Sequence, residues 1–349
     1  MTRMWRCYLS SVAFLLLVPI TAEAEQIKLR ISSQLPNSSH IGANLLQFKD
    51  EVERRTEKAI AVEIYDNSRF YKDNEVVAAV SSGAIEMGAA PVDQFAEKVP
   101  AVVIFQQPFL FNFEALVRAA TNPDREIRKL IDKAVLEAFG TRILWWQTFG
   151  STVFFSKGRP TMSPAGIRDQ KVRVFGKTMA IFTEHCGGNP KIISPNEQLK
   201  ALQDGTVDMA MTGISGVQAR QLWKATDTIT RTEHAAIELM VIINEGVWQR
   251  LRENYQSIII EVAREVEKDL RDRISEIEDD AYRFAREKGM KIYDLTPDQV
   301  AEWRACSSPV LEAFMTDAED MARLLMEAYG KLRTDPCCSS GPAGSFKSR

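Results

Sequence analysis

The chain has 349 residues, of which 45% are hydrophobic and 26% charged, and its formal net charge is −3 at pH 7. This is the composition of a globular protein, and the length leaves room for about two domains. The mild acidic balance argues against a nucleic-acid partner, because such a partner would require a basic surface.

The first 24 residues have the pattern of a secretory signal peptide. Arg3 and Arg6 form the positively charged N-terminal region, and an apolar stretch runs from Val12 to Ile20. The sequence Ala22-Glu23-Ala24 fits a cleavage site. The apolar stretch is short for a membrane span, although an uncleaved anchor is the alternative. No cysteine lies at the cleavage point, which argues against a lipoprotein. We therefore expect an exported, periplasmic protein with no direct membrane insertion after cleavage.

The segment that follows alternates between strand-like and helix-like patterns. Strands are expected at 26–33, 61–65 and 85–89, and helices at 40–56 and 75–81. This β-α-β-α-β order predicts a parallel sheet, and the loops at its strand ends would form the rim of a ligand site. Three residues of these loops are candidate ligand contacts: Gln34, Phe70 and Asp93.

The segment 166–213 shows the same alternation of strand-like and helix-like patterns. Strands are expected at 171–175, 191–194 and 207–211, and Ser194 is expected to cap the helix before the last of them. A second parallel sheet is therefore predicted.

Arg173 is the unusual residue of this second half. It alternates with Val172 and Val174, so its side chain points away from these two β-branched neighbours. A guanidinium suits a carboxylate ligand, because its paired N–H donors match two carboxylate oxygens. An arginine that bridges structural carboxylates is the alternative.

Other segments connect the two halves. The aromatic strand 142–150 contains Gln147, another candidate ligand contact. An apolar strand at 236–244 is expected to return to the first half, and 245–289 has a continuous helical pattern. The helices at 296–332 are expected to pack on the second domain.

Five sequence fragments, taken in their order along the chain, resemble those of a known family. The motif KVRVFG and the following EQLKALQDGTVD occupy 171–176 and 197–208, after NSRF at 67–70, SGAIEMG at 82–88 and QPFLF at 107–111. Together they resemble the solute receptors of tripartite ATP-independent periplasmic (TRAP) transporters, of the DctP type. The resemblance covers nearly the whole chain after the leader.

The resemblance implies an α/β fold, that of a two-domain, type II-like periplasmic binding protein with a ligand cleft between the domains and a long helix spanning both. Domain I would comprise 25–149 plus 237–277, and domain II 150–236 plus 278–334. Residues 335–349, rich in Pro, Gly and Ser and containing Cys337 and Cys338, are expected to form a disordered tail.

The resemblance also implies a function. The protein would capture a small organic acid by domain closure and deliver it to the TRAP membrane permease subunits, which an ion gradient drives. Arg173 would pair with the ligand carboxylate. A receptor for an ATP-driven (ABC) transporter and a receptor for a membrane sensor kinase are the alternatives.

Three positions depart from the family pattern. Thr152 stands where a second Arg is common, Phe175 where Pro is common, and Thr212 where many sugar-acid receptors have Asn. These departures argue against a sugar acid. The aromatic residues Trp145, Trp146, Phe149 and Phe155 favour a monocarboxylate with a partly apolar body, such as a 2-oxo, hydroxy or aromatic acid. The full set of candidate ligand contacts is Arg173, Gln34, Phe70, Asp93, Gln147, Thr152, Phe175 and Thr212.

The sequence contains no recognisable catalytic motif. The three histidines are widely spaced, and neither a nucleophile elbow nor a P-loop is present. His40 is expected in solvent in the first turn of a helix, with a ligand contact as the alternative. We therefore expect no enzyme activity, no cofactor and no metal. The four cysteines after the leader are too few for a disulfide framework.

Overall fold

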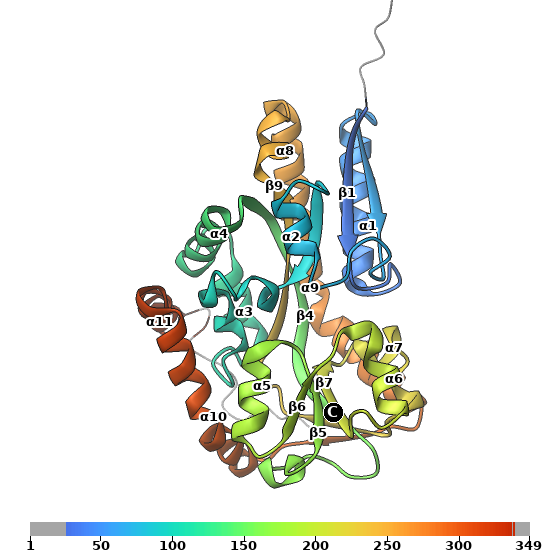
Figure 1. Ribbon diagram of the computed structural model, residues 1–349, viewed down its shortest axis with the longest axis vertical. Coiled ribbons are helices and arrows are strands. Elements are labelled where there is room, and N and C mark those ends of the chain that lie inside the picture. The colour runs from blue at the N-terminus through green and yellow to red at the C-terminus, as the bar shows by residue number, and fades with distance from the viewer. Residues whose placement is uncertain (1–25, 337, 339–349) are drawn as a thin grey trace, which may run out of the picture.

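The computed structural model describes residues 26–336 and Cys338. The predicted signal peptide and most of the predicted disordered tail lie outside the described residues. Within the described part, no helix is long and apolar enough to cross a membrane. The chain folds into two α/β lobes stacked along the long axis of the molecule (Figure 1).

The first lobe is built on five strands in the order β2-β1-β3-β9-β4. As predicted, the first three strands are parallel, whereas β9 runs antiparallel to both of its neighbours. The strands of this lobe are β1 (Ile27–Ser33), β2 (Ile60–Tyr65), β3 (Met87–Pro91), β4 (Thr141–Ser156) and β9 (Ala236–Asn244). The helices that cover them are α1 (His40–Arg55), α2 (Val76–Ser81), α3 (Glu114–Thr121), α4 (Glu126–Phe139) and α8 (Glu245–Arg250).

The second lobe begins where β4 continues beyond Gly150. The C-terminal part of β4 pairs with β7 and β8, and β5 lies between β7 and β6 in the predicted parallel arrangement. Its strands are β5 (Lys171–Val174), β6 (Asn189–Ile192), β7 (Met209–Gly213), β8 (Thr228–Arg231) and β10 (Lys291–Asp294). Its helices are α5 (Gly176–His185), α6 (Gln198–Gln203) and α7 (Gly216–Ala219).

The long helix α9 (Glu253–Glu287) spans both lobes. Its 35 residues correspond to a length of about 50 Å. One end packs Ile259 and Val262 into the first lobe, and the other packs Ala281 and Ala285 into the second. The expectation of a continuous helix over 245–289 is wrong, because Leu251 and Arg252 adopt an extended backbone that separates α8 from α9.

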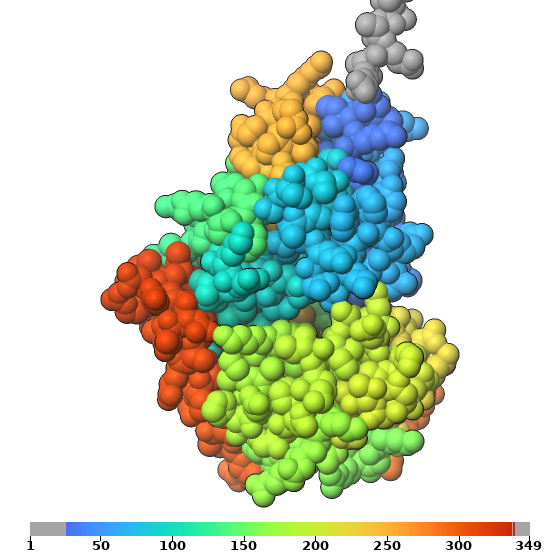
Figure 2. Space-filling view, viewed as in Figure 1, coloured from blue at the N-terminus to red at the C-terminus, as the bar shows by residue number. Residues whose placement is uncertain are grey.

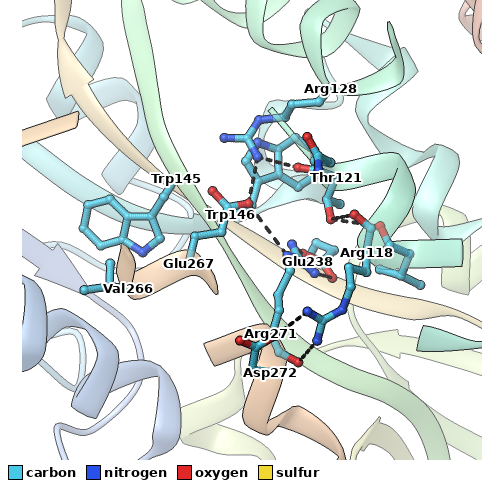
Figure 3. A network of polar contacts seen from close by, with 12 residues as sticks. Arg118, Thr121, Arg128, Trp145, Trp146, Glu238, Val266, Glu267, Arg271 and Asp272 are labelled. Atoms are coloured by element: carbon cyan, nitrogen blue, oxygen red, sulfur yellow. Dashed lines mark hydrogen bonds and ion pairs between the residues drawn. The ribbon is translucent and has the colours of Figure 1, made fainter. Parts of the chain in front are cut away.

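Buried ion pairs attach α9 to the first lobe (Figure 3). Arg271 donates to the Glu238 carboxylate of β9 at 2.7 Å, and Glu267 accepts from Arg128 of α4 at 2.9 Å. All four side chains are buried. Removal of one partner would leave an uncompensated buried charge, at a cost of about 3–5 kcal/mol.

The chain passes from the first lobe to the second on β4 near Gly150. This glycine has φ +98°, and the pairing of β4 with β9 shifts register between Thr148 and Gly150. The Glu278 carboxylate of α9 accepts a hydrogen bond from the Ser151 amide at 2.9 Å and fills the space where a side chain at Gly150 would lie. Burial raises the pKa of Glu278 to about 7.

The last two helices form a strap along both lobes (Figure 1). Helix α10 (Pro297–Asp317) starts at a capping box on Thr296 and packs on α5, to which a Cys186–Cys306 disulfide joins it. Helix α11 (Glu319–Thr334) instead packs in the core of the first lobe. The expectation that both helices pack on the second domain is therefore wrong for α11, and the exact division of the chain into domains stays a prediction.

The Cys186–Cys306 disulfide was not predicted from the small number of cysteines. Its two cysteines are 120 residues apart, so nothing local in the sequence links them. Cys338, which was assigned to the tail, is buried against the first lobe near Ala115.

Candidate functional site

A cavity of about 610 Å³ lies between the two lobes, a size that suits a small molecule. Figure 2 shows the hollow between the cyan first lobe and the yellow-green second lobe. Residues from both lobes line it. They include Gln34, Leu35, Asp73, Pro91, Asp93, Phe149, Arg173, Phe175, Ile193, Ser194, Asn196, Thr212, Arg220, Ile237 and Leu239.

Arg173 reaches this cavity from β5 and is only 2% exposed. Its Nε donates to the Ile193 carbonyl at 2.8 Å, and its Nη1 donates to the Met211 carbonyl at 3.0 Å. These neutral acceptors fix the guanidinium and leave its other N–H donors for a ligand. Burial lowers the pKa of Arg173 to about 10, against the pull of Asp93 and Asp73, so the side chain is charged at neutral pH.

A second arginine, Arg220, lies in the same cavity directly after α7. Its Nη1 donates to Gln198 and its Nη2 to the Thr212 hydroxyl, each at 2.7 Å, and its guanidinium lies 5.6 Å from the Phe149 ring centre. Burial lowers the pKa of Arg220 to about 9, and the like charge of Arg173 acts in the same direction. Sequence reasoning missed this residue, because Arg220 stands in an ordinary polar segment with no motif around it.

Neither arginine has a carboxylate partner within ion-pairing distance among the described residues. The alternative that Arg173 bridges structural carboxylates is therefore not supported. Two buried, charged guanidiniums without an anion are costly unless a ligand provides one.

The opposite wall comes from the first lobe and brings carboxylates. Asp73 accepts from the Ser194 hydroxyl at 2.7 and 2.8 Å, and Asn196 donates to the Ser68 hydroxyl at 3.1 Å. These bonds cross from one lobe to the other, so the structure is in a closed arrangement. Ser194 does not cap the following helix as predicted, because its hydroxyl is engaged with Asp73.

Five of the eight predicted contacts line the cavity: Gln34, Asp93, Arg173, Phe175 and Thr212. The structure places the other three elsewhere. Gln147 donates to Ile41 and Asn44 of α1, Thr152 donates to the Ala235 carbonyl, and Phe70 stacks on Tyr65 and Tyr71 with 40% of its surface exposed. Their hydrogen bonds and ring contacts turn these side chains away from the cavity.

His40 is also placed differently from the prediction. It is half-buried, and its ring centre lies 5.0 Å from that of Phe149, which itself lines the cavity. Burial lowers the pKa of His40 to about 4, so its ring is neutral at physiological pH. Among the described residues, no group of three or more His, Cys, Asp or Glu side chains gathers into a metal site.

Two α/β lobes on either side of a cavity with buried arginines are the architecture of a two-domain solute-binding protein. Comparison with known proteins agrees. Residues 31–317 match the DctP family of bacterial extracellular solute-binding proteins, family 7, and the chain belongs to this family.

Two relatives illustrate the similarity of sequence. The chain is 26% identical to the C4-dicarboxylate-binding periplasmic protein DctP of Rhodobacter capsulatus, with 86% of this chain and 90% of the relative covered. It is 25% identical to the 2,3-diketo-L-gulonate-binding periplasmic protein YiaO of Escherichia coli, with 86% and 90% covered.

A solved structure shows the similarity of fold. DctP7 of Bordetella pertussis, an extracytoplasmic solute receptor crystallised with pyroglutamic acid, superposes with a TM-score of 0.82 at 19% identity, and 87% of this chain and 99% of DctP7 are covered. The predicted fold class and family are therefore confirmed.

Proposed function

We propose that this protein binds a small carboxylate in the cavity between its lobes, with Arg173 and Arg220 as the groups that hold the carboxylate. The observation that carries this proposal is the pair of buried guanidiniums without an anionic partner among the described residues. Both donate to neighbouring residues of β7, Met211 and Thr212, so they are positioned from the same strand. A carboxylate between them would offset both charges.

The other cavity walls restrict the body of the ligand. Phe149, Phe175, Ile237 and Leu239 are apolar, which suits a ligand with a partly apolar body. This supports the preference for a monocarboxylate over a sugar acid, although curated and solved relatives bind acids of several types, among them C4-dicarboxylates and pyroglutamic acid.

The mode of action follows from the two lobes. Ligand binding in the open form is followed by closure, and contacts made only in the closed form favour that state. The closed receptor would then deliver the acid to TRAP membrane permease subunits, after export by the N-terminal signal peptide. We propose no catalytic step for this protein.

A thermal-shift screen of the mature protein against small carboxylic acids tests this function. A ligand at 100 times its dissociation constant should stabilise the fold by about 2.7 kcal/mol. The stabilisation should be lost in Arg173→Ala and kept in Arg168→Ala, which removes an exposed arginine of the same lobe. A hit that survives Arg173→Ala would remove Arg173 from the site, and stabilisation by neutral sugars instead of acids would reject the carboxylate.

A further inference from the structure

Asp93 is the first-lobe carboxylate that comes closest to the start of α5. It follows β3 in a short 3-10 turn (Val92–Phe95) and lies against Gly176, the first residue of α5. A Cβ atom placed on Gly176 would lie 2.8 Å from the Asp93 Cβ and 3.2 Å from its Oδ2. Glycine at 176 therefore lets the carboxylate of one lobe approach the other lobe, and Asp93 and Arg173 line the same cavity.

The partners of Asp93 are all neutral. Gln94 Nε2 donates to its carboxylate at 2.9 Å and Gln106 Nε2 at 3.4 Å. No Lys or Arg nitrogen among the described residues lies within ion-pairing distance of it. Burial raises the pKa of Asp93, and the two amides and the more distant Arg173 act in the opposite direction. A carboxylate can accept about four hydrogen bonds, so this one retains acceptor capacity towards the cavity.

The two other acidic residues of the cavity are accounted for. Asp73 is engaged in the contact between the lobes through the Ser194 hydroxyl, and Glu197 is exposed, whereas Asp93 accepts only from two amides of its own lobe. Asp93 is thus the carboxylate that a bound ligand would meet inside the cavity.

We propose that the ligand carries an N–H donor as well as its carboxylate, and that Asp93 accepts this donor while Arg173 and Arg220 hold the carboxylate. The proposal rests on the proposed function and narrows its ligand class to acids with an ammonium, ring amine or amide N–H. A site built around a buried acceptor discriminates strongly against an analogue without the donor, because the acceptor is then left unpaired.

Matched pairs of acids test the proposal by calorimetry on the mature wild-type protein. Proline is compared with tetrahydrofuran carboxylate, whose ring oxygen replaces the nitrogen, and pyrrolidone carboxylate with the corresponding lactone acid. In at least one pair the nitrogen compound should bind about 10- to 100-fold more tightly than its oxygen counterpart. The first pair probes an ammonium donor and the second a neutral N–H.

Two variants assign the preference to a residue. Asp93→Leu, which removes the acceptor, should reduce the difference within the preferred pair to less than about threefold. Asp73→Asn is the control: it weakens a contact between the lobes and should lower the affinity of both members of a pair equally.

The failures are distinguishable. If the oxygen and nitrogen members of both pairs bind equally well to the wild type, the inference is overturned, but the proposed function as a carboxylate receptor stands. An N–H preference that persists in Asp93→Leu would overturn the role of Asp93. If no carboxylic acid in the thermal-shift screen binds, the proposed function fails, and the inference fails with it.

Discussion

In the proposed function, Arg173 and Arg220 are buried charges that are kept for a ligand. Each guanidinium is fixed by carbonyl, amide or hydroxyl oxygens, and neither is neutralised by an acid within ion-pairing distance in the described part of the chain. Elsewhere in the core the pattern is different, since Arg271 and Arg128 both pair with carboxylates of the protein. The contrast separates arginines that stabilise the fold from arginines that are available to an anion.

The raised pKa of Glu278 predicts that the stability of the protein depends on pH. Its folded-state pKa of about 7 lies above the ordinary value of 4.5, so the folded protein holds a proton that the unfolded chain releases between these values. Stability should therefore fall as pH rises from about 4.5 to 7. Other groups facing Glu278 also contribute charge, namely Glu233, Glu114 and Arg231.

The variant Glu278→Gln isolates this contribution. The difference in unfolding free energy between wild type and variant should decrease from pH 5 to pH 8 by roughly 1–3 kcal/mol. Urea unfolding at several pH values measures it, and the other titrating groups cancel because both proteins contain them. A difference that does not change with pH would show that Glu278 titrates normally.

At the scale of elements, the Cys186–Cys306 disulfide connects α5 to the C-terminal strap. It closes a loop of 120 residues and joins the end of a helix that starts beside the cavity to a helix whose Trp303 fills the core of the second lobe. The disulfide should therefore stabilise the second lobe without touching the ligand.

Replacement of both cysteines by Cys186→Ser and Cys306→Ser should lower the free energy of unfolding by about 2–5 kcal/mol. Binding of the carboxylic acid ligand at low temperature should be retained, because neither cysteine lines the cavity. Reductant should destabilise the wild type and leave the double variant unchanged. Equal sensitivity of the two proteins would mean that the cysteines are not bonded in solution.

At the scale of the whole molecule, hydrogen bonds between the lobes favour the closed form. Ser194 and Asn196 of the second lobe contact Asp73 and Ser68 of the first. These contacts can exist only when the cavity is shut, so they contribute to closure and not to initial encounter with the ligand.

The double variant Ser194→Ala and Asn196→Ala should shift the ligand-free protein towards the open form. If the free energy that favours the closed form decreases by about 2 kcal/mol, the affinity for every carboxylic acid ligand should weaken by up to about 30-fold. Small-angle scattering should show a larger radius of gyration without ligand and a normal decrease on saturation. An unchanged affinity would show that these bonds do not contribute to closure.

The sequence by itself determined the two parallel β-α-β units and indicated Arg173 as a candidate ligand contact, which the structure places in the cavity lining. These features depend on local patterns: alternation of apolar residues, glycines at turns, and a charged residue opposite two valines. The resemblance to solute receptors added three predictions: the crossing near Gly150, the division into domains and the closing mechanism.

Only the tertiary structure decided which residues meet in the cavity. Arg220, from a segment without a motif, lines the cavity, whereas Gln147 and Thr152 form hydrogen bonds in the protein core. Cys186 and Cys306, 120 residues apart, form a disulfide. The tertiary structure also placed Asp93 against Gly176. Contacts of this kind depend on how separate elements pack in three dimensions, and sequence spacing carries no record of them.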